Sequence, residues 1–108
     1  MLIYGLKNCD KCRAARKVLQ SAEFVDIREV PLSVTALAKL IETYGDAIVN
    51  KKSTTWRSLR EIDRQLPIIE LLQAYPALMK RPIIKDQNGN YSVGWTAKIM
   101  EKFQSFES

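Results

Sequence analysis

The chain has no histidine and only two cysteines among its 108 residues. A closed zinc site needs four ligands, usually cysteine and histidine, so this chain could complete one only between subunits. No apolar run approaches the roughly 20 residues of a membrane helix, and the start at Met1–Gly5 lacks the basic and apolar segments of a secretory signal. These absences predict a cytoplasmic protein that does not bind a membrane, in a compartment where thiols are mostly reduced.

Charge of one sign is in moderate excess. Seventeen basic residues against 12 acidic ones give a net charge of +5, which favours anionic partners. The basic residues are scattered along the chain, and no arginine-rich tail or nucleic-acid motif is present. We therefore expect a solvated basic surface and no direct contact with nucleic acid.

The first 30 residues predict a strand, a helix and a second strand. Leu2–Tyr4 is a short apolar run closed by Gly5, and apolar residues recur at helical spacing from Cys12 onward. Phe24–Val30 alternates as a strand does, and Pro31 ends it. Such a unit places two strands parallel.

The middle of the chain is predicted to be helical. Ser33 or Thr35 can cap a helix that Gly45 ends. A short helix is indicated around Trp56, after a polar break, and Pro67 opens another helix. This stretch carries no strong strand pattern.

The last third predicts a hairpin and a helix. Arg81–Lys85 and Tyr91–Trp95 read as strands joined through Asn88–Gly89, the dipeptide typical of tight hairpins. Thr96 can cap the final helix.

This order defines the expected fold class, which is α/β. It is the thioredoxin-like topology, β-α-β, a helical insert at about 33–79, a β-hairpin and a C-terminal helix, with a mixed four-stranded sheet. At 108 residues with 46% hydrophobic composition, the chain is expected to form one domain over 1–108 with its own core.

Cys9-Asp10-Lys11-Cys12 is a C-x-x-C motif that follows a predicted strand and opens a predicted helix. That position is typical of a thioredoxin-like redox site. The dipole and free N–H groups of the helix would stabilise a thiolate on Cys9, and Cys12 lies one turn further on, placed to attack a mixed disulfide. Two cysteines that merely occupy the core remain the alternative.

Several stretches resemble the arsenate reductase (ArsC) and Spx family, and most of all its uncharacterised YffB-like branch. They are Tyr4–Asp10, Ser53–Arg57, Lys80–Ile83 and Gly94–Thr96, which occur in the family's order through nearly the whole chain. The resemblance implies that Arg81 points at the Cys9 sulfur and binds an anion there. It also implies that Pro82 forms a cis bond and faces the cysteine loop. A surface salt bridge is the alternative role for Arg81.

The chain departs from the arsenate reductases of this family, which resemble single-cysteine enzymes with three arginines around the oxyanion. Only Arg81 is retained here, and the other two positions fall near Asn50 and Gly94. A doubly charged oxyanion calls for several bidentate donors, so the loss argues against arsenate reduction. Lys52 and Arg57 can supply replacement charge.

The resemblance and the motif together predict a thiol–disulfide oxidoreductase, with glutathione as reductant or cosubstrate and no bound cofactor. Cys9 is the expected nucleophile, Cys12 resolves the mixed disulfide, and Arg81 holds an anionic group. The expected binding residues are Lys7, Asn8, Arg13, Lys52, Arg57 and Pro82. The alternative is an Spx-like redox-sensing regulator that binds the RNA polymerase α-subunit.

Overall fold

The computed structural model describes the backbone of residues 1–107 and the side chains of residues 1–105. Over that part of the chain, no helix is both long and apolar enough to cross a membrane. The strands are β1 (Leu2–Gly5), β2 (Glu23–Asp26), β3 (Ile83–Lys85) and β4 (Tyr91–Val93). The α-helices are α1 (Asp10–Val18), α2 (Val34–Tyr44), α3 (Thr54–Ser58), α4 (Glu61–Arg64), α5 (Ile68–Ala74) and α6 (Ala97–Glu107), and short 3-10 turns cover Gly45–Ile48 and Pro76–Leu78.

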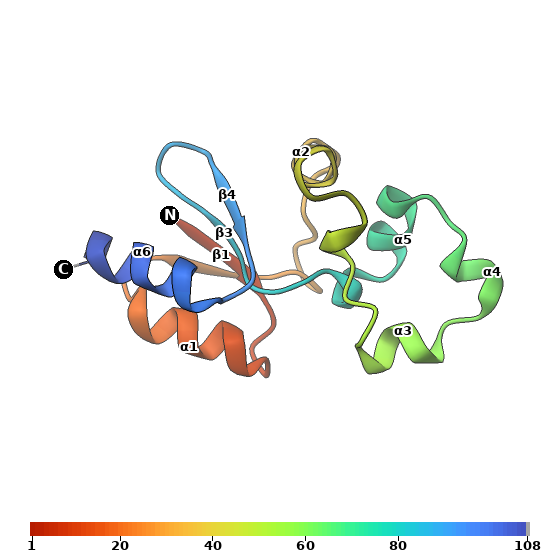
Figure 1. Cartoon of the computed structure of the whole chain (residues 1–108), viewed down its shortest axis with the longest axis horizontal. Helices are drawn as coiled ribbons and strands as arrows, with labels where there is room; N and C mark the ends of the chain where they lie inside the picture. The colour runs from red at the N-terminus through yellow and green to blue at the C-terminus, as the bar shows by residue number, and fades with distance from the viewer. Residues whose placement is uncertain (108) are drawn as a thin grey trace. The chain divides into compact units, whose positions relative to one another are not determined.

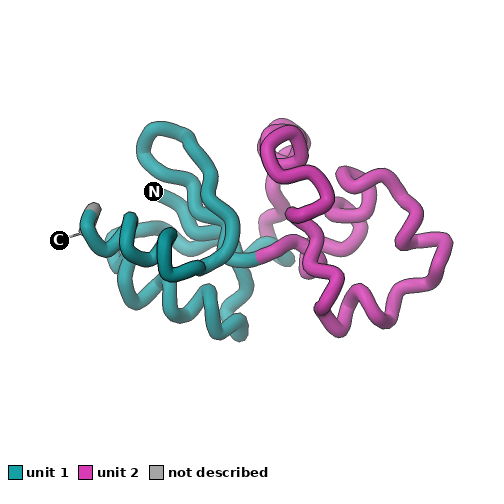
Figure 2. Tube along the Cα trace, in the orientation of Figure 1, with its two compact units in different colours: residues 1–29, 81–108 teal, residues 30–80 magenta. Residues whose placement is uncertain are grey.

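The chain divides into two compact units, coloured separately in Figure 2. The first joins Met1–Glu29 to Arg81–Ser108, and the second is Val30–Lys80. The second unit spans nearly the same residues as the predicted helical insert. The grouping of both units into a single domain stays a prediction.

The first unit contains the predicted mixed four-stranded sheet, which is confirmed. Its strand order is β2-β1-β3-β4, with β1 parallel to β2 and the other neighbours antiparallel. The hairpin between β3 and β4 turns at Gly89, whose φ of +83° suits the glycine that the sequence places there. The thioredoxin-like order of elements is therefore present.

The core of the first unit lies between the sheet and two helices. Both α1 and α6 lie on the same side of the sheet (Figure 1). Ile3 and Ile84 of the central strands pack against Ala15 and Leu19 of the α1 region and Phe103 of α6, and all five are almost fully buried. This packing fixes α1 against the strand that precedes the cysteine motif.

The second strand is shorter than predicted, because β2 ends at Asp26 rather than at Val30. The Asp26 carboxylate accepts the backbone N–H of Arg28 at 2.9 Å, and the Asp26 carbonyl accepts that of Glu29 at 3.1 Å. These hydrogen bonds form a turn, which replaces the strand pairing that the alternating sequence of Phe24–Val30 predicted.

Other boundaries also differ from the prediction, and strand β3 begins at Ile83 rather than at Arg81. Helix α1 begins at Asp10, two residues before the apolar repeat that starts at Cys12, because its first two residues are polar and exposed. Strand β4 ends at Val93, so Trp95 lies outside it and packs against the core of the first unit.

The second unit is a group of short helices held at its ends by backbone pairing. Val49 and Met79 form an isolated antiparallel bridge, and the Lys80 N–H donates to the Ile48 carbonyl at 2.8 Å. The predicted helix around Trp56 is two helices, α3 and α4, which are separated by the extended residues Leu59 and Arg60.

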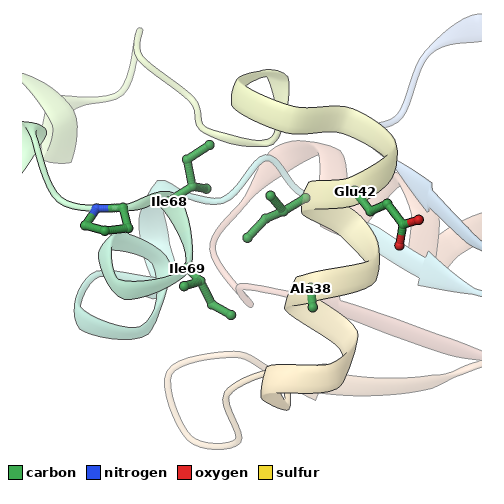
Figure 3. A pocket seen from close by; sticks show the side chains of 6 residues that line it. Ala38, Glu42, Ile68 and Ile69 are labelled. Atoms are coloured by element: carbon green, nitrogen blue, oxygen red, sulfur yellow. The ribbon is translucent and has the colours of Figure 1, made fainter.

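A shallow apolar pocket of about 470 Å³, open to solvent, lies on the second unit. Figure 3 shows Ala38 and Glu42 on α2 and Ile68 and Ile69 at the start of α5, with Ile41 and Pro67 completing the lining. None of the predicted site residues lines this pocket.

The cap of α2 decides between the two candidates in the sequence. The Ser33 hydroxyl accepts the Ala36 N–H at 3.1 Å, whereas Thr35 lies within the helix. We predict that Ser33→Ala lowers the free energy of unfolding by about 1 kcal/mol, because a helix N–H loses its acceptor. Urea unfolding followed by circular dichroism measures this loss, with Thr35→Ala as the matched control. Equal losses in the two variants would contradict the assignment of the cap.

Candidate active site

The two cysteines lie at the N-terminus of α1, directly after β1. Cys9 is the N-cap, in an extended conformation with φ −91° and ψ 124°, and its carbonyl accepts the Arg13 N–H at 2.9 Å. Its own N–H donates to the Leu6 carbonyl at 3.2 Å, which closes the loop from the strand to the helix. Both thiols are free.

Burial separates the two thiols. Cys12 is fully buried in the core of the first unit, whereas Cys9 is partly exposed. A C-x-x-C spacing on a helix places the second cysteine about one turn below the first. Cys9 is therefore the thiol that a substrate can reach, and Cys12 lies behind it.

The pKa of Cys9 is lowered from its ordinary value. Partial burial acts to raise the pKa, but hydrogen bonds to the sulfur from the Cys12 backbone N–H, the Cys12 thiol and the Arg81 guanidinium outweigh it, helped by the positive charge of Arg81. Each of these groups favours the charged form of Cys9. The site thus stabilises a thiolate, which is the nucleophilic form of cysteine.

The pKa of Cys12 moves the other way, to about 12. Burial is the main cause, and the neighbouring Cys9 sulfur adds to it, while a hydrogen bond from the Leu6 backbone opposes the rise. Cys12 therefore remains a neutral thiol at physiological pH. In that form it donates its proton to the Cys9 thiolate.

Arg81 and Pro82 stand directly before β3, beside the cysteine loop. The Arg81–Pro82 peptide bond is cis, as the family resemblance implies. Pro82 is fully buried, and its carbonyl accepts the Gly94 N–H at 2.8 Å. Arg81 is partly exposed, and its guanidinium contacts the Cys9 sulfur. This arrangement can hold an anionic group next to the reactive sulfur.

The remaining predicted residues of the cysteine loop are Lys7, Asn8 and Arg13, and all three are exposed. Arg13 pairs with the Asp10 carboxylate, one turn of α1 away. The groups that lower the pKa of Cys9 are Cys12 and Arg81. Substrate binding by these three residues stays a prediction.

Lys52 and Arg57 belong to the second unit and are exposed there. The Arg57 guanidinium donates to the Lys52 carbonyl at 2.9 Å, and the Lys52 N–H donates to the Asn50 side chain at 3.1 Å. These hydrogen bonds stabilise the start of α3. Replacement of the lost oxyanion charge by these residues stays a prediction.

One residue of the site was missed in the sequence. Gly5 was interpreted only as the end of the first strand, yet a β-carbon at this position would overlap the Cys12 sulfur. The Tyr4-Gly5 step within the family-like motif was the signal available. No local pattern reveals such a contact, because the two residues meet only through the fold.

The site and the fold together define a thioredoxin-like protein with a dithiol centre. Residues 4–103 match the ArsC family, so the chain belongs to that family. Within residues 1–107, no cluster of three or more potential metal ligands was found.

Two relatives span most of the chain. An uncharacterised protein of Haemophilus influenzae is 36% identical over 106 residues, covering 89% of this chain and 91% of that protein. The global transcriptional regulator Spx of Listeria innocua is 29% identical, covering 94% of this chain and 84% of Spx.

Solved structures agree with these sequence matches. A protein named YffB superposes with a TM-score of 0.82 at 27% identity, covering 95% of this chain and 97% of YffB. An arsenate reductase (ArsC) related protein from Brucella melitensis superposes with a TM-score of 0.68 at 30% identity, covering 94% and 91% of the two chains. The family, its Spx members and these structures support a thiol redox protein.

The geometry predicts how the two thiols react with iodoacetamide. Only Cys9 should be alkylated in the native protein, with a pH midpoint below the value of about 8.5 for a free thiol. Arg81→Ala should raise the midpoint, because the thiolate loses a hydrogen bond and its cationic partner. The measurement is the alkylation rate against pH, followed by mass spectrometry of the modified peptide.

Arg16→Ala is the matched control for that measurement. It also removes one positive charge close to the motif, but its guanidinium lies 4.3 Å from the centre of the Phe24 ring. Its midpoint should equal that of the unmodified sequence. A Cys9 midpoint at the free-thiol value, unchanged by loss of Arg81, would show that the thiol is not activated.

Proposed function

We propose that the protein is a cytoplasmic thiol–disulfide reductase that uses glutathione as its reductant. The observation that carries the proposal is the contrast between the two thiols. Cys9 is reachable and has a lowered pKa beside Arg81, and Cys12 is buried with a pKa of about 12. A reductase needs one thiol that attacks and a second that waits until a mixed disulfide forms.

The reaction begins when the Cys9 thiolate attacks one sulfur of a substrate disulfide. A bond forms between that sulfur and Cys9, the substrate S–S bond breaks, and the other half leaves as a thiolate that takes a proton from water. Cys12 then loses its proton and attacks the Cys9 sulfur, which releases the second half and leaves a Cys9–Cys12 disulfide. The substrate has gained two electrons and two protons.

Two glutathione molecules return the enzyme to its reduced form. The first attacks Cys9, forming a glutathione–Cys9 disulfide and releasing Cys12 as a thiol. The second attacks the glutathione sulfur, releasing oxidised glutathione and the Cys9 thiolate. The sum is reduction of one disulfide at the expense of two glutathione thiols.

Arg81 suits the binding of glutathione, which carries two carboxylates. Its guanidinium is next to the Cys9 sulfur, so a carboxylate held there keeps the incoming thiol close to the sulfur that it must attack. Lys7, Asn8 and Arg13 are exposed around the same loop and are proposed to add weaker contacts. Pro82, which has no N–H, is proposed to present its backbone edge to the bound substrate.

Steady-state reduction of a small mixed disulfide by glutathione tests the proposal. Cys9→Ser should abolish turnover. Without glutathione, Cys12→Ser should stop at the mixed disulfide between Cys9 and the substrate, detectable as an intact-mass adduct. Arg81→Ala should raise the glutathione concentration for half-maximal rate by about tenfold or more, since a hydrogen bond to a charged group is worth about 1.5–3 kcal/mol. Arg16→Ala serves again as the control and should leave the rate unchanged.

Two results would contradict the proposal. One is a rate with the full protein no higher than that of Cys9→Ser. The other is turnover supported by thioredoxin but not by glutathione, which would mean that the protein is a reductase with a different reductant.

A second candidate function is redox-sensing regulation of transcription, favoured by the similarity to Spx. In this alternative the Cys9–Cys12 disulfide switches a surface that binds the RNA polymerase α-subunit, and no substrate is turned over. We predict that purified α-subunit is not retained by the immobilised protein in either redox state. Retention that depends on the redox state would favour the regulator, and an Spx protein is the positive control.

A further inference from the structure

We infer that Gly5 is a positioning residue of the dithiol site: its missing side chain leaves the space in which the Cys12 sulfur lies against Cys9. The inference deepens the proposed function and rests on it, since it concerns how the second thiol is held for the reaction. It does not require that glutathione be the reductant.

The contact is between the backbone of β1 and the Cys12 side chain. A β-carbon at Gly5 would overlap the Cys12 sulfur and would lie 3.3 Å from the Cys12 β-carbon. The nearest atom of any other residue, in the Phe24 ring, would be at an ordinary distance of 3.8 Å. Only Cys12 is therefore in the way of a side chain at this position.

Backbone conformation does not explain the glycine. The glycines with positive φ are Gly45, Gly89 and Gly94, and Gly5 is not among them. It is paired in parallel register with Asp26 as the last residue of β1, a conformation that any residue adopts. In a strand, alanine is favoured over glycine because glycine loses more conformational freedom on folding, so the preference for glycine here comes from the space that it leaves.

The overlap can be relieved mainly by movement of the sulfur. The Gly5 carbonyl accepts the Ile27 N–H at 3.1 Å, which holds the strand end, and α1 is fixed by Ala15 and Leu19 in the core. The sulfur alone can rotate about the Cα–Cβ bond. Such a rotation carries it away from Cys9, which loses a hydrogen-bond donor and its resolving partner.

The first test is a double-mutant cycle on stability. Gly5→Ala should lower the unfolding midpoint in urea when Cys12 is present. The same change should be neutral or stabilising in the Cys12→Ala background, where the sulfur is absent and the strand preference for alanine remains. If Gly5→Ala does not fold, recovery of folding in the double variant supports the same conclusion. An equal loss in both backgrounds, or failure of both to fold, would overturn the inference.

The second test asks whether Gly5 acts on the chemistry. In the folded Gly5→Ala variant, the pH midpoint of Cys9 alkylation should rise toward that of Cys12→Ala. Closure of the Cys9–Cys12 disulfide should slow by about tenfold to a hundredfold, as expected for reacting groups displaced by about an ångström. Ala22→Val is the control, because it disturbs the same core without adding an atom beside Cys12. Its alkylation midpoint should stay unchanged.

The two proposals fail in different ways. An ordinary midpoint for Cys9 in the unchanged protein would remove the proposed function, yet the stability cycle would still report on Gly5 and Cys12. A lowered pH midpoint of Cys9 alkylation that is the same in the unchanged protein and in Gly5→Ala would overturn the role of Gly5. It would not contradict the proposed reductase function.

Discussion

The packing of α1 against the sheet is the constraint on which the dithiol site depends. Ala15 and Leu19 are buried against Ile3 and Ile84, so the helix cannot slide along the strands without opening the core. Its N-terminus is thereby held at the end of β1 and beside the residue that precedes β3. Two cysteines from one part of the chain and Arg81 from a distant part meet there for this reason.

The same packing makes two chemically different groups from two identical side chains. Cys9 is partly exposed at the helix N-cap, where N–H groups and a guanidinium favour the charged form. Cys12 points into the core, where desolvation favours the neutral form. The two thiols thus differ in solvent access and hydrogen bonding, and the proposed attack by Cys9 and the later reaction of Cys12 rest on this difference.

Proteins that are similar to this chain are named for different functions. Relatives over nearly the whole chain include a transcriptional regulator, and similar structures include an arsenate reductase related protein. A switch and a reductase both require the Cys9–Cys12 disulfide. They differ in whether a substrate disulfide reacts with Cys9 and is released in reduced form. The partial exposure of Cys9 beside the Arg81 guanidinium suits the reductase.

The sequence by itself determined the order of elements, the C-x-x-C motif at the start of a helix, and the cap at Thr96, because periodicity and capping are local. It left Ser33 and Thr35 as alternative caps of α2. The sequence-based prediction was wrong about the end of β2, where a turn closed by the Asp26 side chain replaces strand pairing. Only the tertiary structure decided that Cys12 is buried while Cys9 is not, that Arg81 reaches the Cys9 sulfur, and that Gly5 makes room for the Cys12 sulfur. Burial and contacts between distant residues arise from packing, which no local pattern encodes.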